Sequence, residues 1–252
     1  MPSDLVLATF NIRSGLAPDG RHLWPLRRHA TAAMVRHLGA DVLGLQEVFR
    51  WQLSYLLDHL DGYEAHGTGR SRRRRGEACP VLVRRSRLRV VEERTRWFGA
   101  EPDRPGGRLP GASFPRMATL VMVADRGGGE PFLVVNTHLD ERRPENRRAA
   151  AAQLVTWLPT GTPVIVLGDL NTTEDDDEVF SVFRAAGLRS TLPAGAGGTA
   201  HQFRGGTGGR RIDHILVSDH WEVEEAAVVT EPVGRFLPSD HWPVRAVLRL
   251  RE

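Results

Sequence analysis

Residues 163–173 read PVIVLGDLNTT, and this stretch decides the fold class. Pro163 to Leu167 is a short apolar run that predicts a buried strand, and Asp169 and Asn171 follow where that strand ends. Because these two residues are two positions apart, their side chains leave an extended chain on the same face. A carboxylate and an amide aimed at one point can bind and orient a water molecule. The alternative is an Asx-type turn, which is common for Asp and Asn after a strand.

Polar residues follow three other apolar runs in the same way. Asn11 follows VLATF, Gln46 and Glu47 follow VLGL, and Asn136 and His138 follow FLVV. In open α/β folds, the loops at the carboxyl ends of strands build binding sites. Packing alone is a poor explanation, because each set would end a core strand with an unpaired polar group. The pattern therefore favours one polar site at a sheet edge.

A further candidate lies near the end of the chain, where SDHWPV spans residues 239–244. The neighbours Asp240 and His241 form a pair in which a carboxylate can fix the tautomer of an imidazole or stabilise its charged form. The alternative is a polar turn before the last strand.

Hydrophobic periodicity predicts one mixed α/β domain over residues 1–252, with strands outnumbering helices. No linker or internal repeat divides the chain. The predicted helices are Trp24 to Leu38, Trp51 to Leu60, Arg147 to Leu158 and Thr173 to about Ala186. The predicted strands are residues 6–10, 42–45, 80–83, 88–91, 117–123, 132–136, 163–167, 212–217, 222–229 and 244–250.

Composition excludes several classes of protein. The single cysteine, Cys79, excludes a disulfide framework and a multi-thiolate metal site within one chain. The uncharged stretch 149–168 is interrupted by Pro159, Gly161 and Pro163, so it does not predict a membrane span. With no signal-like N-terminus either, we expect a soluble, cytoplasmic protein that has no membrane partner and no obligate protein partner.

Eight segments, in order, resemble the endonuclease/exonuclease/phosphatase (DNase I-like) superfamily, and within it a bacterial branch whose substrate is not assigned. They are FNIR, LQEV, GEACPVLVRR, PRMATL, NTHLD, GDLNTT, RIDHILVS and SDHWPV, and together they span Phe10 to Val244. The resemblance implies a four-layer α/β sandwich, in which two mixed sheets lie face to face between helices. It also implies an active site at one edge of the two sheets.

The same resemblance assigns the site residues. Asp169 would deprotonate or orient the attacking water, His138 and His241 would bind the scissile phosphate, and Asp213 would support a histidine. The catalytic set is His138, Asp169, Asn171, Asp213, Asp240 and His241. The substrate-binding set is Arg116, Asn136, Arg147 and His201, and the metal-binding set is Asn11, Glu47 and Glu77.

The chemistry of these side chains agrees with a phosphoester hydrolase that uses a metal ion and direct attack of water. Amide and carboxylate oxygens select a hard cation such as Mg²⁺ or Mn²⁺, whereas zinc prefers more histidine or cysteine. No residue stands out as a covalent nucleophile.

Three hypotheses about the function stay open, and two of them differ in the substrate. The chain contains no lysine, and RSRRRR at Arg70 to Arg75 precedes Glu77, so this run is either a phosphate clamp or a solvated, mobile loop. A clamp favours a phosphodiesterase or nuclease acting on nucleic acid or nucleotides. The compact chain favours a phosphomonoesterase acting on a small phosphorylated metabolite. A non-catalytic binding module on the same fold is the third hypothesis, and it predicts that site residues have been lost.

Overall fold

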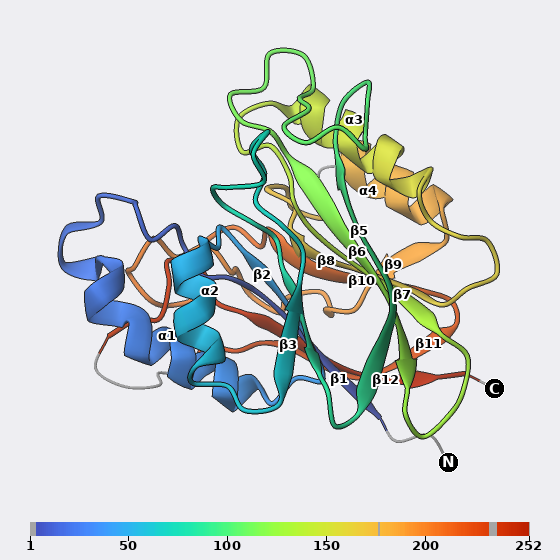
Figure 1. The fold of residues 1–252 in the computed structure, drawn as a ribbon, viewed down its shortest axis with the longest axis horizontal. Helices are drawn as coiled ribbons and strands as arrows, with labels where there is room; N and C mark the ends of the chain where they lie inside the picture. The colour runs from blue at the N-terminus through green and yellow to red at the C-terminus, as the bar shows by residue number, and fades with distance from the viewer. Residues whose placement is uncertain (1–3, 176, 232–235, 252) are drawn as a thin grey trace.

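Two mixed β-sheets form the centre of the protein (Figure 1). The computed structural model describes residues 4–175, 177–231 and 236–251. In the first sheet the strand order is β11 (Trp221–Val228), β12 (Val244–Leu250), β1 (Leu5–Asn11), β2 (Val42–Gln46), β4 (Val81–Arg84) and β3 (Tyr63–His66). In the second sheet it is β5 (Leu88–Trp97), β6 (Met117–Asp125), β7 (Phe132–His138), β8 (Val164–Asp169), β10 (Asp213–Ser218) and β9 (Leu188–Ser190).

Helices cover the outer face of each sheet, so the predicted four-layer sandwich is confirmed (Figure 1). Helices α1 (Trp24–Leu38) and α2 (Arg50–Leu57) pack on the first sheet, and α3 (Pro144–Val155) and α4 (Asp177–Ala185) pack on the second. The core between the sheets is aliphatic and includes Leu7, Val42, Val134 and Ile165. The helical layers use separate apolar clusters, which contain Met34 and Leu38 on one side and Leu154 and Phe183 on the other.

A parallel pair of strands lies inside each sheet, and this feature positions the site. Strand β1 is parallel to β2, with Asn11 opposite Gln46, and β7 is parallel to β8, with His138 opposite Asp169. The other strand pairs within the described residues are antiparallel. Because parallel strands end at the same edge, each pair delivers the polar residues at its carboxyl ends to one place.

Several element boundaries differ from the predicted ones. Helix α3 begins at Pro144 rather than Arg147, since proline is well suited to the first turn of a helix. Strand β5 continues to Trp97, because an exposed edge strand needs no apolar run to persist. Strands β3 and β9 were not predicted, because they are short and lack a clear apolar alternation.

The uncharged stretch 149–168 divides into the end of α3, a turn and β8, as predicted. No helix in the described part of the chain has both the length and the apolar character needed to cross a membrane.

Gly168 offers a test of how tightly β7 and β8 approach beside the site. Its φ is 145°, and a Cβ there would lie 1.9 Å from the carbonyl oxygen of Thr137. We expect Gly168→Ala to lower the free energy of unfolding by about 3 kcal/mol or more, because the backbone strain and the steric overlap with Thr137 add. Urea denaturation measures this loss. Gly128→Ala is the control: its φ is 105°, a Cβ there meets nothing within 4 Å, and the loss should be about 1 kcal/mol. Equal losses in the two variants would contradict the close approach.

Candidate active site

The side-chain amide of Asn11 joins the two sheets at their shared edge. Its Nδ2 donates to Oε1 of Glu47, which follows β2 in the same sheet, and to Oδ2 of Asp169, which ends β8 in the other sheet; both distances are 3.0 Å. Its Oδ1 accepts the backbone N–H of Arg13 at 2.9 Å. One buried amide therefore sets the positions of two carboxylates that come from different sheets.

Left-handed backbone conformations cluster around this amide. Glu47 has a φ of 62°, Asn171 of 53° and Arg13 of 59°. Asparagine tolerates this region, but for glutamate and arginine it is uncommon, and such strain gathers at functional sites. The backbone N–H of Ser14 donates to Oε2 of Glu47 at 2.8 Å and helps to hold its half-buried carboxylate.

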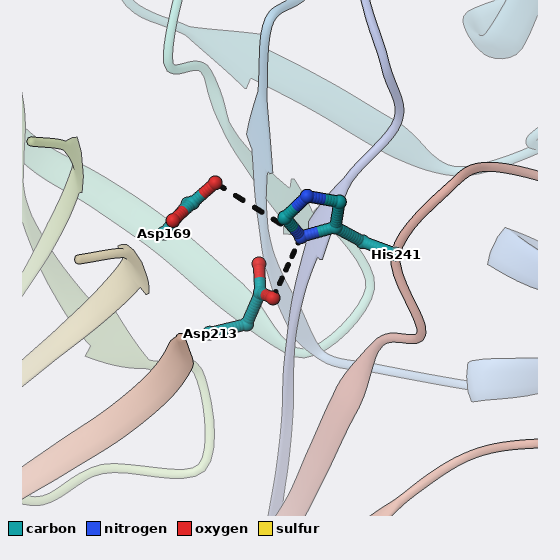
Figure 2. A group of neighbouring side chains, drawn as sticks. All are labelled: Asp169, Asp213 and His241. Carbon is teal, nitrogen blue, oxygen red and sulfur yellow. Dashed lines mark hydrogen bonds and ion pairs between the residues drawn. The ribbon is translucent and has the colours of Figure 1, made fainter. Parts of the chain in front are cut away.

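His241 lies between the carboxylates of Asp169 and Asp213 (Figure 2). Its Nδ1 is 2.8 Å from Oδ2 of Asp213 and 3.9 Å from Oδ2 of Asp169. Burial opposes the charge on His241, but the negative charge and hydrogen bond of Asp213 outweigh it and raise its pKa well above the usual value. The imidazole is thus held as a cation, and because Asp213 occupies Nδ1, Nε2 is the ring nitrogen that can meet a substrate.

Asp169 is the shared neighbour of both candidate histidines. Burial, together with the negative charge of Asp213, raises the pKa of Asp169. The backbone N–H of Asn171 donates to its Oδ1 at 2.9 Å, which is the Asx-type turn that the sequence offered as an alternative. A buried carboxylate with a raised pKa is suited to accept a proton near neutral pH, so the turn and a catalytic role are compatible here.

His138 differs in charge from His241, although both are near Asp169. Its Nε2 is 3.6 Å from Oδ2 of Asp169. Burial lowers the pKa of His138 well below its usual value, and the positive charges of Arg116 and Arg70 act in the same direction. His138 is therefore neutral where His241 is charged.

The segment before β12 completes the site. Oδ2 of Asp240 lies 3.5 Å from Nη1 of Arg13, which also forms an ion pair with Asp19. The hydroxyl of Ser239 donates to the backbone carbonyl of Asn11 at 2.7 Å, so this segment is attached directly to the end of β1.

Glu77 and Arg116 lie on the His138 side of the site. Both line a small cavity of about 10 Å³, together with Glu47, Arg70 and His138. Oε2 of Glu77 is 2.8 Å from Nη1 of Arg70, and Arg116 forms an ion pair with Glu141. Burial raises the pKa of Glu77, and the charge of Arg70 opposes that shift.

Two predicted substrate-binding residues face the interior. Asn136 is fully buried: its Oδ1 accepts from Gln46, and its Nδ2 donates to the carbonyls of Leu45 and Pro80. Arg147 is buried in α3 and donates to the carbonyl of Asp140.

His201 is buried as well, with its ring 4.3 Å from that of Trp242 and its backbone N–H bonded to Asp240. It also lines a cavity of about 590 Å³ together with Asp240 and His241, so it stays a predicted substrate-binding residue. The contacts of Asn136 and Arg147, in contrast, position neighbouring segments.

Two groups of side chains could hold a metal ion. Asp169, Asp213 and His241 each offer one ligand atom, and these atoms all lie within 4.8 Å of one another. In the predicted group of Asn11, Glu47 and Glu77, the two glutamates offer carboxylate oxygens, which a hard cation prefers, and the Nδ2 of Asn11 donates to Glu47.

Arg13 and Ser239 are site residues that were not predicted from the sequence. Both lie inside quoted motifs, FNIR and SDHWPV, so position in the motif was the available signal. Their contacts are to backbone groups or to carboxylates far away in the chain, which local spacing cannot predict.

The chain is similar to known proteins over nearly its whole length. The Endonuclease/Exonuclease/phosphatase family matches residues 8–241. No curated protein sequence matches the chain. A Bacteroides vulgatus structure described as an endonuclease/exonuclease/phosphatase has a TM-score of 0.90 at 28% identity, and the match covers 99% of this chain and 100% of that one.

Other similar structures carry different descriptions. The Bacteroides thetaiotaomicron mannosyl-6-phosphatase has a TM-score of 0.88 at 26% identity, over 98% of this chain and 100% of that one. D. rerio TDP2 complexed with single strand DNA product has a TM-score of 0.76 at 19% identity, and the match covers 98% of this chain and 100% of that one. At this identity the likeness shows the fold alone. The resemblance inferred from the eight motifs is confirmed.

Asp213 should control the charge of His241. We expect Asp213→Asn to lower the pKa of His241 by about 1 pH unit or more, because the substitution removes the negative charge that favours the imidazolium. An NMR titration of the imidazole resonances measures this, and His29, on α1 away from the cluster, is the internal reference. An unchanged His241 titration would show that Asp213 does not hold its proton.

Proposed function

The chain belongs to the endonuclease/exonuclease/phosphatase family, and from that premise we propose that it hydrolyses a phosphoester by direct attack of water. The observation that carries the proposal is the position of one carboxylate oxygen. Oδ2 of Asp169 lies within hydrogen-bond distance of Asn11 and within 4 Å of a neutral and a charged histidine. This arrangement places a proton acceptor beside donors that can bind a phosphoryl group.

In the proposed reaction a water oxygen forms a bond to phosphorus while its proton passes to Asp169. The ester P–O bond breaks, its electron pair stays with the leaving oxygen, and that oxygen takes up a proton. The charged imidazole of His241 faces the phosphoryl oxygens and stabilises their developing negative charge. Asp213 keeps that imidazole charged and fixes its ring.

The side chains on the Glu47 side are suited to Mg²⁺ or Mn²⁺, because Glu47 and Glu77 carry carboxylate oxygens and the Nδ2 of Asn11 holds Glu47 in place. When bound, such a cation supplies Lewis-acid stabilisation of phosphoryl and leaving-group charge. The left-handed backbone of Glu47 supports its assignment as a metal ligand, since backbone strain of this kind gathers at functional sites.

We propose a phosphodiester of nucleic acid or a nucleotide as the substrate, because arginines gather beside the site. A phosphomonoesterase acting on a phosphorylated sugar is the second candidate, and it is favoured by the likeness to the mannosyl-6-phosphatase. The binding-module hypothesis loses support, since it predicts lost site residues and the cluster is assembled. A screen of sugar phosphates, nucleotides and single- and double-stranded DNA and RNA with Mg²⁺ or Mn²⁺ separates these candidates, and hydrolysis of none would overturn the proposal.

Activity should require a divalent cation bound through Glu47. We expect EDTA to abolish turnover and Mg²⁺ or Mn²⁺ to restore it. We also expect Glu47→Gln to lose most activity while keeping the fold, since it removes one ligand charge at similar volume. Glu222→Gln, the same change at an exposed position on β11, is the control. Full turnover in EDTA would rule out the metal.

Asp169 should determine the rate of the chemical step. We expect Asp169→Asn to lower kcat by about 100-fold or more, because the amide cannot accept the proton of the attacking water. Steady-state kinetics measure this effect, and Asp219→Asn, at an exposed turn, is the control. A rate near that of the wild type would place the active site elsewhere.

A further inference from the structure

The arginine-rich segment after β3 is a closed hairpin. The backbone N–H of Arg70 donates to the carbonyl of Glu77 at 2.9 Å, and that of Ser71 to the carbonyl of Arg75 at 3.0 Å. The indole N–H of Trp97 donates to the carbonyl of Arg70 at 2.7 Å and fixes the base of the hairpin. The arginines Arg72 to Arg75 therefore project into solvent from a hydrogen-bonded turn.

A cleft of about 700 Å³ lies between this hairpin and residues 106–115. The two walls approach closely, since a Cβ at Gly106 would lie 2.7 Å from the backbone nitrogen of Arg72. The charged side chains that line the cleft are Arg70, Arg72, Arg73, Arg75, Arg108 and Glu77. We call it the arginine cleft.

The positive charge of the arginine cleft is largely uncompensated. Glu77 is the acidic residue in its lining, and it is already paired with Arg70 at 2.8 Å. Among the described residues, Arg72, Arg73 and Arg75 form no ion pair. Like charges held on a short hairpin repel one another, so an anion that binds among them is stabilised by all three.

The arginine cleft adjoins the small cavity that reaches His138. Arg70, Glu77 and Pro115 line both the cleft and the small cavity that reaches His138. Phe49 and Phe114 also line the cleft, and the Arg70 guanidinium lies 4.5 Å from the ring centroid of Phe114. A group held there would belong to the same molecule as a phosphoryl group held at His138.

We propose that the arginine cleft binds a second phosphate of the substrate, beyond the one that is hydrolysed. This inference rests on the proposed function for the location of the scissile phosphate. A nucleic-acid strand and a compact polyphosphorylated metabolite both carry such a second phosphate, and arginine forks match its oxygens. The test must therefore distinguish these two sources.

The test variant is the triple substitution Arg72→Ser, Arg73→Ser and Arg75→Ser, with Arg70 left in place because it pairs with Glu77. The matched control, Arg85→Ser, Arg89→Ser and Arg148→Ser, removes the same charge from exposed positions outside the arginine cleft. Binding of fluorescein-labelled oligothymidylate dT10 and of tripolyphosphate is measured in EDTA, so that no turnover accompanies it. Circular dichroism checks that both variants fold.

We expect the cleft variant to bind dT10 about tenfold or more weakly at low salt, and the control to stay close to the wild type. The slope of log affinity against log salt should decrease by about 0.7 for each phosphate of the single strand that the variant no longer binds. The ratio of kcat/KM for dT10 to that for bis(4-nitrophenyl) phosphate, which has a single phosphate, should fall about tenfold in the cleft variant alone.

The remaining outcomes each decide the inference. Weaker binding of tripolyphosphate with unchanged dT10 binding would support a second-phosphate site for compact polyphosphates. Equal losses of affinity in both triple variants would show a general charge effect and overturn the site, as would unchanged binding of both probes. If the wild type hydrolyses neither ester with Mg²⁺ or Mn²⁺, the proposed reaction fails, whereas the binding data still decide the arginine cleft.

Discussion

The hydrogen bond between Asn11 and Asp169 is the contact on which the site depends. It joins residues 158 positions apart in the sequence and connects the two sheets where their parallel strands end. The aliphatic core between the sheets favours their association but does not fix their register, because dispersion and burial are not directional. Buried polar groups do fix it, since each costs free energy unless its partner is in place. Asn136, bonded to Gln46 across the same interface, extends this constraint deeper into the sandwich.

The same constraint explains which parts of the site could be predicted from the sequence. Apolar strands followed by polar residues indicated one sheet edge, and the eight motifs indicated the four layers. Period-two alternation correctly places Asn136 and His138 on one face of β7, but it does not show depth. Asn136 lies two residues, or about 7 Å, further inside, where the other sheet covers it. The left-handed backbone of Glu47 and the pairing of Arg13 with Asp240 depend on tertiary contacts, which no local pattern encodes.

Two histidines near one carboxylate oxygen differ in charge because their other neighbours differ. His241 has Asp213 behind it, and this second carboxylate outweighs the cost of burial. His138 has Arg116 and Arg70 nearby, which add to that cost. A phosphoryl group in contact with both rings would meet a cation at His241 and a neutral ring next to arginines at His138. The protein thus supplies positive charge near both rings but carries it on different types of side chain.

The pairing of β1 with β12 brings the first and last strands of the domain together in one sheet. Each parallel pair with its connecting helix is a local unit that can form early, since its contacts span few residues. The first sheet, however, lacks β12, the second neighbour of β1, until residues 244–250 have left the ribosome. Asp240 and His241 directly precede that strand, so they enter the site among the last residues of the domain to be synthesised. In a nascent chain the cluster of Asp169, Asp213 and His241 therefore cannot assemble until nearly the whole domain exists.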